Sequence, residues 1–437
     1  MSHYDNLKQQ AADNLAEFSK KVGHEINPDT FCLLPFIHIS TMPHGEIKLC
    51  CRGQPPAGGT SKDNPHVQDP NFSLKEYWES DYMNDIRDKL LTGKREAQCK
   101  NCWKMEDKDI LSLRHNRMID YGYDPRESYV ENVKQYMDTG KIPFNVPLLE
   151  LKLTNLCNFK CRMCWPKDSS LWWQDWDKVE KYYDDDTKSY IRKTREIVGG
   201  KNMSNVYQTN ANFVDDLLHL MENVEEIEFA GGEPILDPIH FNILDSVKYP
   251  ERVTLKYSTN LSTLVLNKKF DIIGMWKKFK DIKLTISIDG NKDTNHIIRR
   301  GADWETLKQN VEIVRRELDN IAFMKGSTCI SAHNALTLDK TAEAIIMELG
   351  IKWHTSRLQY PDFQHANIHK PEELQQSVDR LNITKQKLKE FGATKFDMLH
   401  VDNSINWLLD CIKNNAYGEK SQRFLDFNKT IDGLDVK

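Results

Sequence analysis

Three cysteines lie close together in the sequence CNFKCRMC, at Cys157, Cys161 and Cys164. This spacing lets one tight loop surround three corners of a cubane iron–sulfur cluster. No fourth cysteine follows nearby, and an iron atom without a protein ligand can bind and activate a small molecule. A structural zinc ion normally takes four protein ligands, so zinc is the less favoured alternative for this motif.

The elements around this motif are short apolar runs that alternate with segments of helical periodicity. The runs typical of strands are Leu148–Leu153, Ile227–Phe229, Val253–Tyr257, Leu284–Ile288, Thr328–Ile330 and Ile351–Leu358. The helical segments include His240–Val247, Trp304–Leu318 and Thr341–Leu349. This alternation predicts a parallel sheet built from βα units. Six such units predict a partial barrel, with its functional groups at the carboxyl ends of the strands.

Small and polar residues occupy those strand ends. The second strand runs into AGGEP, the third ends in YSTNL, the fourth in SIDG and the fifth in SAHN. Paired glycines let the backbone approach a ligand closely. An arginine in HIIRRG, either Arg299 or its neighbour Arg300, can meet a carboxylate with its forked guanidinium group.

In this order, CNFKCRMC and the strand-end motifs resemble the radical S-adenosylmethionine (SAM) superfamily. The resemblance implies that Cys157, Cys161 and Cys164 hold a [4Fe–4S] cluster whose free iron binds the methionyl amino and carboxylate groups of SAM. The SAM-binding residues implied in the same way are Met163, Gly231, Gly232, Glu233, Pro234, Ser258, Asn260, Ser287, Asp289, Arg299 and Asn334.

The resemblance also implies a role for several of these residues. The GGEP segment would bind the methionyl ammonium group, and Arg299 would pair with the methionyl carboxylate. Ser287 and Asp289 would lie near the ribose, and Met163 would pack against the adenine.

A second group of cysteines lies nearer the N-terminus, at Cys32, Cys50, Cys51, Cys99 and Cys102. Four thiolates from this group would suit an iron–sulfur cluster or a structural zinc ion. Adjacent residues of an extended segment point to opposite faces, so Cys50 and Cys51 cannot both face one metal site. The spacing around Gly45 resembles the twitch domain, a shortened SPASM domain that carries an auxiliary [4Fe–4S] cluster. The resemblance favours Cys32, Cys50, Cys99 and Cys102 as ligands, with zinc as the alternative.

The expected fold is therefore α/β: a partial (β/α)6 TIM-like barrel with an N-terminal twitch-type domain and a C-terminal helical extension. The expected segments are an N-terminal helical extension, the twitch-like domain, the barrel and the C-terminal extension, at residues 1–30, 31–145, 146–365 and 366–437. In the better-known relatives the iron–sulfur module follows the barrel, whereas here it comes first. An exposed loop is expected between Gly53 and Asn71.

Composition restricts the class of protein. The 437 residues are 39% apolar and 29% charged, with a net charge of −5, which is typical of a soluble globular protein. No apolar stretch reaches the length of a membrane span, and the N-terminus reads as a short polar helix without a secretion signal. These features predict a cytoplasmic protein with reduced thiols, in which the isolated Cys329 and Cys411 are buried small side chains.

Function follows from the resemblance. A radical SAM enzyme cleaves SAM reductively to a 5′-deoxyadenosyl radical, which abstracts hydrogen from a substrate, and it needs an electron donor such as a flavodoxin or ferredoxin. Twitch-type relatives favour oxidative modification of a peptide or protein side chain, and a small-molecule substrate is also open. One alternative is a nucleoside, nucleotide or RNA substrate, although the acidic balance argues against a long polyanion. A second alternative is a non-catalytic electron-transfer protein, which would not need a nucleoside-binding site.

Two further segments carry structural expectations. In SSLWWQDWDKVEKYYDDD, an apolar stripe predicts one helix packed on the barrel; its members are Trp172, Trp173, Trp176, Val179 and Tyr183. From Pro371 onward the chain is expected to be helical and to cap the barrel mouth or contact a partner.

Overall fold

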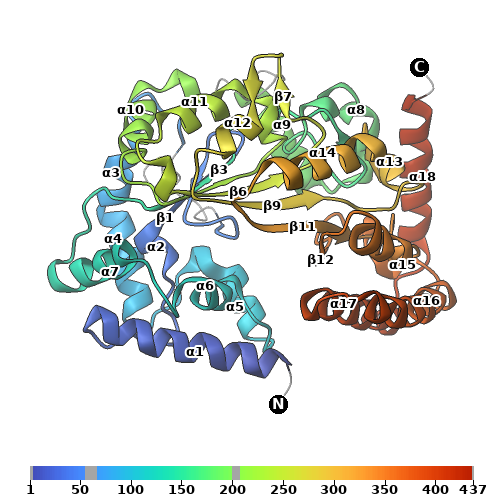
Figure 1. Ribbon diagram of the computed structural model, residues 1–437, viewed down its shortest axis with the longest axis horizontal. Coiled ribbons are helices and arrows are strands. Elements are labelled where there is room, and N and C mark those ends of the chain that lie inside the picture. The colour runs from blue at the N-terminus through green and yellow to red at the C-terminus, as the bar shows by residue number, and fades with distance from the viewer. Residues whose placement is uncertain (1–2, 55–65, 199–206, 436–437) are drawn as a thin grey trace. The chain divides into compact units, whose positions relative to one another are not determined.

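The structure is a computed structural model that describes residues 3–54, 66–198 and 207–435 (Figure 1). Residues 55–65, most of the expected exposed loop, lie outside the described residues. The chain divides into two compact units. The first unit comprises residues 1–153, 204–229 and 242–254, and the second comprises residues 154–203, 230–241 and 255–437.

The fold is mixed α/β with a central parallel sheet, and all six expected strands are confirmed. They are β3 (Leu148–Leu151), β5 (Glu226–Phe229), β6 (Thr254–Thr259), β9 (Asp281–Ser287), β11 (Ile321–Ile330) and β12 (Lys352–Arg357). In the first unit β3 pairs in parallel with β5, and in the second unit β11 pairs in parallel with β9 and β12. Apolar residues alternate along β9, where Ile282, Leu284 and Ile286 are buried on one face.

The first unit also contains two strands that the sequence analysis did not predict. β1 (His38–Thr41) pairs in parallel with β3, and β2 (Ile47–Lys48) pairs antiparallel with β1. The strand order in this unit is therefore β5-β3-β1-β2. The sequence HIST has only one strongly apolar residue, Ile39, so its strand character depends on pairing with β3.

The helices of the first unit begin with α1 (His3–Val22), at the place where an N-terminal helix was expected. One face of α1 is buried at Ala11, Leu15, Phe18 and Val22, a spacing that gives an amphipathic rather than a polar helix. The other helices are α2 (Leu34–Ile37), α3 (Leu74–Glu79), α4 (Asp81–Leu91), α5 (Lys100–Glu106), α6 (Leu113–Tyr121), α7 (Glu127–Thr139) and α10 (Ala211–Leu220). α1 packs against α6 and α7.

In the second unit the strand order is β12-β11-β9-β6, and two small two-stranded pairs lie outside this order. The small pairs join β4 (Lys160–Cys161) to β10 (Arg299–Arg300) and β7 (Val265–Leu266) to β8 (Phe270–Asp271). The helices of this unit before the C-terminal extension are α8 (Trp176–Val179), α9 (Asp185–Val198), α12 (Ile272–Trp276), α13 (Asn295–Ile298), α14 (Trp304–Glu317) and α15 (Leu338–Glu343). α11 (Pro238–Ser246) has its first four residues in this unit and the others in the first unit. The helices expected at His240–Val247 and Trp304–Leu318 correspond to α11 and α14.

The C-terminal extension is helical, as expected, and consists of α16 (Pro371–Phe391), α17 (Lys395–Lys413) and α18 (Glu419–Asp435). α16 and α17 pack against each other, and α17 packs along β12. Asp397 on α17 accepts a 2.7 Å hydrogen bond from the backbone N–H of Trp353 on β12. α17 therefore covers the last strand of this unit, a common protection for a sheet edge. No helix among the described residues is both long enough and apolar enough to cross a membrane.

The aromatic segment at residues 170–183 is not the single helix expected. It forms a 3₁₀ turn (Ser170–Gln174), the short α8 and another 3₁₀ turn (Glu180–Tyr182). The break comes at Asp175, whose carboxylate pairs with Lys178 at 3.0 Å and also with Lys160. Burial of the whole apolar stripe is confirmed, so the side chains form core although the helix is interrupted.

Candidate iron–sulfur and SAM site

The thiol loop, residues 157–164, carries Cys157, Cys161 and Cys164 in the second unit. Cys161 lies on β4, which pairs with Arg299 on β10. The backbone N–H of Cys164 donates to the carbonyl oxygen of Cys161 at 3.0 Å, and the indole N–H of Trp172 donates to the same oxygen at 3.1 Å. The short β-pair, this tight turn and the buried tryptophan thus fix the path of the loop.

The three thiols share one electrostatic environment. Burial, and then the neighbouring Cys161, raise the pKa of Cys157 to about 12. A hydrogen bond from Cys164 lowers the pKa of Cys161, and the same bond raises the pKa of Cys164. The Arg299 cation acts on all three groups in the direction that favours thiolates. Three thiols beside one guanidinium, with Cys161 buried and Cys157 and Cys164 half-buried, fit the donor set of a [4Fe–4S] cluster.

The GGEP segment lies directly against the residues that precede the thiol loop. The N–H of Gly232 donates to the carbonyl oxygen of Thr154 at 2.9 Å, and the N–H of Glu233 donates to that of Leu156 at 2.7 Å. A Cβ atom on Gly232 would lie 2.2 Å from the Leu156 oxygen, and Gly231 has a φ of +116°. Both positions therefore require glycine, as the motif predicts.

Glu233 points into the protein and joins two strand ends. Its carboxylate accepts hydrogen bonds from the Thr259 hydroxyl at 2.7 Å and from the Asn260 N–H at 2.6 Å. Burial raises the pKa of Glu233 to about 7, and these hydrogen bonds act against that rise. The carboxyl group thus holds Asn260 in place, and the Asn260 amide in turn donates to Asn158 at 2.9 Å.

Asp289 and Arg299 form a buried ion pair at the end of β9. Asp289 has no exposed surface, and one carboxylate oxygen lies 2.6 Å from Arg299 Nε. The other oxygen accepts the N–H of Cys329 at 2.7 Å. Arg299 Nη1 lies 3.7 Å from Cys161 Sγ. The pair therefore places the guanidinium beside the thiol loop, although the sequence analysis treated Asp289 and Arg299 as separate SAM contacts.

Asn334 makes its hydrogen bonds within the protein. Its side-chain amide donates to the carbonyl oxygens of Asp289 at 3.1 Å and Cys329 at 3.0 Å, and its oxygen accepts the N–H of Ser331 at 2.9 Å. These bonds hold the end of β11. The expected contact of Asn334 with SAM stays a prediction.

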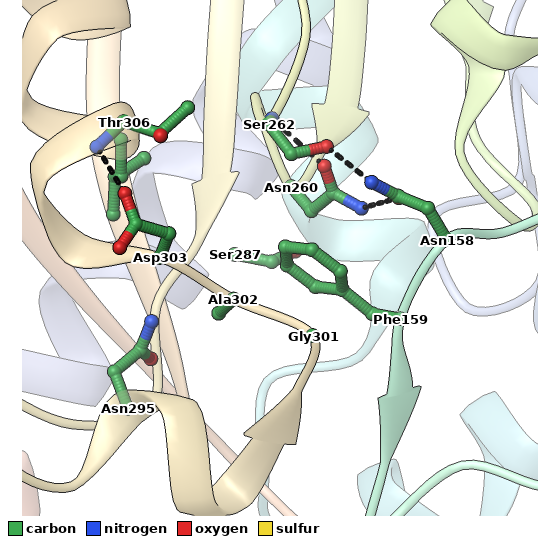
Figure 2. Close-up of a pocket in the computed structure, with 11 residues that line it drawn as sticks. Asn158, Phe159, Asn260, Ser262, Ser287, Asn295, Gly301, Ala302, Asp303 and Thr306 are labelled. Carbon is green, nitrogen blue, oxygen red and sulfur yellow. Dashed lines mark hydrogen bonds between the residues drawn. The ribbon is translucent and has the colours of Figure 1, made fainter.

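A cavity of about 190 Å³ opens beside the thiol loop (Figure 2). Its lining consists of Asn158, Phe159, Asn260, Ser262, Ser287, Asn295, Gly301, Ala302, Asp303, Thr306 and Leu307. Asn260 and Ser287 were expected from the sequence. Figure 2 shows Asn260, Ser262 and Asn158 together on one side and Asp303 with Thr306 on the other. The cavity is rich in amide and hydroxyl groups, which suit the polar parts of a nucleoside or an amino acid.

The remaining cavity residues were missed because their motifs lie outside the strand ends that the sequence analysis used. Asn158 sits inside CNFKCRMC and donates to the Ser262 hydroxyl at 2.8 Å. Asp303 caps α14 by accepting the Thr306 N–H at 2.7 Å. An N-cap signal after HIIRRG would have found Asp303. Ser258 and Met163 are half-buried, on β6 and in the thiol loop, and line no part of this cavity.

The N-terminal cysteines are gathered in the first unit, in what we call the four-thiol pocket. It is lined by Cys32, Leu34, Cys50, Arg52, Gly53, Cys99, Cys102, Trp103, Leu113 and Arg114. Burial raises the pKa of Cys32 to about 12 and also raises those of Cys50 and Cys99. Cys51 is exposed instead, and the charges acting on its thiol are those of Glu150 and Lys152 among others. The structure thus places Cys50 in the pocket and Cys51 outside it.

A single metal ion has no ready-made site in the described part of the chain. Within those ranges, no three or more His, Cys, Asp or Glu side chains are arranged as the ligands of one ion.

Comparisons with known proteins show what part of the chain is similar to. The radical SAM cyclopropyl synthase TigE of Paramaledivibacter caminithermalis is 22% identical over 259 residues, which is 56% of this chain and 50% of TigE. Molybdenum cofactor biosynthesis protein 1 of Dictyostelium discoideum is 23% identical over 239 residues, 52% of this chain and 33% of that protein. The chain thus spans half or less of these curated relatives.

Solved structures of similar proteins align with this chain at low sequence identity and low TM-score. Streptococcus suis SuiB aligns with a TM-score of 0.35 and 11% identity, covering 85% of this chain and 71% of SuiB. A structure of anSMEcpe with bound AdoMet aligns with a TM-score of 0.33 and 15% identity, covering 56% of this chain and 62% of that one. The family model described as the radical SAM superfamily matches residues 151–345. This segment of the chain is therefore similar to the radical SAM superfamily domain.

Proposed function

We propose that this chain is an enzyme that cleaves SAM reductively and abstracts hydrogen from a substrate. The observation that carries the proposal is the meeting of three thiols, the GGEP backbone and Arg299 at one place in the second unit. With a [4Fe–4S] cluster on Cys157, Cys161 and Cys164, the bound SAM would supply a 5′-deoxyadenosyl radical.

The residues around the thiols would bind and orient SAM. Arg299 is held by Asp289 through its Nε atom, which leaves its terminal nitrogens to meet the methionyl carboxylate. The close backbone approach at Gly232 would let the edge of the GGEP segment face the methionyl ammonium group. We place Arg300 second as the carboxylate ligand, because Arg299 is the arginine aligned with Cys161 in the β4–β10 pair.

The polar cavity would hold the remaining polar part of SAM. Asn260 and Ser287 line it, and Glu233 fixes the Asn260 backbone. Ser258, Met163, Pro234 and Asn334 complete the proposed set of SAM-binding residues.

We assign the four-thiol pocket to an auxiliary [4Fe–4S] cluster held by Cys32, Cys50, Cys99 and Cys102. The support is that these four thiols line one pocket while Cys51 lies outside it. On this basis residues 31–145 would form a twitch-like domain before a barrel at residues 146–365, flanked by helical extensions at 1–30 and 366–437.

Iron analysis tests that assignment. Reconstituted protein should contain about eight irons and eight sulfides per chain, the content of two cubane clusters. Cys50→Ser should lower both contents by about half, whereas Cys51→Ser should leave both unchanged. Four irons with one zinc ion in the wild type, or equal losses in the two variants, would contradict the assignment.

The proposed substrate is a peptide or protein side chain that is oxidised, with a flavodoxin or ferredoxin as electron donor. This part of the proposal rests on the resemblance of the N-terminal module to the twitch domain.

The activity itself is tested by anaerobic incubation of the reconstituted protein with dithionite and SAM. The expected products are 5′-deoxyadenosine and methionine, measured by mass spectrometry. Deuterated peptides and deuterated nucleosides, supplied separately, identify the substrate class because deuterium from the true class appears in 5′-deoxyadenosine. Protein with intact clusters that forms no 5′-deoxyadenosine would overturn the proposal and favour an electron-transfer protein.

A further inference from the structure

The thiol loop is attached to the C-terminal helix α18 through one side chain, Arg162. This arginine stands between Cys161 and Met163, and its side chain is only 8% exposed. Its Nη1 atom donates to the side-chain oxygen of Asn428 at 2.7 Å, and its Nη2 atom forms an ion pair with Asp432. Both partners lie on α18, more than 260 residues further along the chain.

The same guanidinium also reaches the segment that carries Arg299. Its Nε atom donates to the carbonyl oxygen of Ile297 at 2.9 Å. The backbone N–H of Arg162 donates to the carbonyl oxygen of Ile298 at 2.9 Å. On the other side, the Gln364 amide donates to the Arg162 carbonyl oxygen at 3.3 Å. Arg162 therefore joins the thiol loop, the approach to β10 and α18 at a single point.

Helix α18 has its own anchor on the second unit. Phe427 is fully buried and lies 5.2 Å from Phe363 and 5.6 Å from Tyr182, measured between ring centroids. Ile431, one turn further along, is also fully buried. Figure 1 shows α18 running alongside α8, against which it packs. Because aromatic packing holds the helix, Asn428 and Asp432 are presented to Arg162 from a fixed support.

We infer that Arg162, Asn428 and Asp432 form a clamp through which α18 positions the thiol loop for cluster and SAM binding. The three residues are positioning residues, since none of them is a thiol or lines the polar cavity. The contact requires an arginine. The two terminal nitrogens of the Arg162 guanidinium group meet the Asn428 amide oxygen and the Asp432 carboxylate on one face of α18, and a lysine has only one nitrogen to offer.

Hydrogen exchange on the cluster-free protein tests the clamp without reference to iron or SAM. The reporters are the amides of Arg162 and Cys164, which donate to Ile298 and Cys161. In Asn428→Ala/Asp432→Asn these amides should exchange at least about tenfold faster, the size of effect expected when a charged hydrogen bond is lost. Asp432 is 60% exposed and Phe427 keeps the helix docked, so the variant should fold.

Asp426→Asn is the matched control. It removes the same charge from the same helix, but the Asp426 side chain contacts Gln422 rather than Arg162. Exchange in the thiol loop should equal that of the wild type. Wild-type exchange rates in the double variant, or equal acceleration in the control, would overturn the clamp.

The loaded enzyme gives a second readout. In the double variant, KM for SAM should rise by about tenfold while kcat changes less, because the clamp acts on the geometry of the binding loop. The exchange experiment uses protein without a cluster, so its result does not depend on the proposed function. The clamp can therefore be disproved while the proposed function stands, and the proposed function can be disproved while the clamp stands.

Discussion

The two groups of cysteines in this molecule have different surroundings. The thiol loop offers three thiols, with a guanidinium beside them and a polar cavity of about 190 Å³ next to the loop. The four-thiol pocket offers four, enclosed by Leu34, Trp103 and Leu113. Its one buried cation, Arg114, is already neutralised by a 2.7 Å ion pair with Glu106. Three ligands beside a polar cavity suit an exchangeable ligand, whereas four ligands under apolar cover suit electron transfer or structure.

The largest expected effect separates the two sites directly. Cys161→Ala should reduce SAM cleavage to the rate without enzyme, because it removes one of the three proposed ligands of the SAM-binding cluster. Under the proposed assignment, Cys102→Ala should remove about half of the iron but retain SAM cleavage, because SAM is assigned to the other cluster. Production of 5′-deoxyadenosine measures both. Equal loss in the two variants would contradict the division of roles.

A smaller but still large effect is expected at the GGEP segment. Gly232→Ala would place a methyl group 2.2 Å from the Leu156 oxygen, which should lower the free energy of unfolding by about 1–3 kcal/mol and weaken SAM binding. Thermal unfolding and SAM titration measure these changes. Gly433→Ala is the control, because nothing lies within 4 Å of its Cβ position. If Gly232→Ala were as stable as this control, the close packing against the thiol loop would be wrong.

A moderate effect on KM for SAM is expected when Arg299, rather than Arg300, is replaced. Arg299→Lys should raise KM for SAM about tenfold, since a lysine cannot contact Asp289 and the methionyl carboxylate together. Arg300→Lys should change KM much less. Steady-state kinetics of the two variants measure KM for SAM and show which arginine contributes more to SAM binding. The opposite ranking would transfer the carboxylate contact to Arg300.

The smallest expected effect concerns acid stability of the second unit. Burial lowers the pKa of His240 to about 3, below the value of about 6.5 for an unfolded histidine. The neutral histidine therefore contributes stability that is complete above pH 6.5 and is lost as the pH falls toward 3. Between pH 6.5 and pH 5 the loss should be about 2 kcal/mol. Urea unfolding of wild type and His240→Gln measures it, and an identical pH dependence in both would contradict the prediction.

Much of the fold was predictable because its signals are local. The six strands follow from short apolar runs, and the glycines of GGEP follow from a backbone contact that excludes any side chain. β1 was not predictable in this way, since HIST becomes a strand only when β3 lies beside it. The aromatic segment shows the same limit: its burial follows from composition, but its break at Asp175 was not predicted from the helical spacing of its apolar residues.

The candidate site also combines features that local sequence predicts with contacts that it does not. The thiol loop could be predicted from spacing alone, whereas the contact of Arg162 with Asp432 joins residues far apart in the sequence. No periodicity encodes such long-range pairs. The choice between Cys50 and Cys51 also required the structure, because both satisfy the same spacing to within one residue.

The most direct test of the central claim is electron paramagnetic resonance of reduced Cys102→Ala, in which the thiol loop should hold the remaining intact cluster. Addition of SAM should shift the g values, because the methionyl group binds an iron that has no thiolate. A spectrum unchanged by saturating SAM would show that the cluster is fully ligated by protein and would contradict the account.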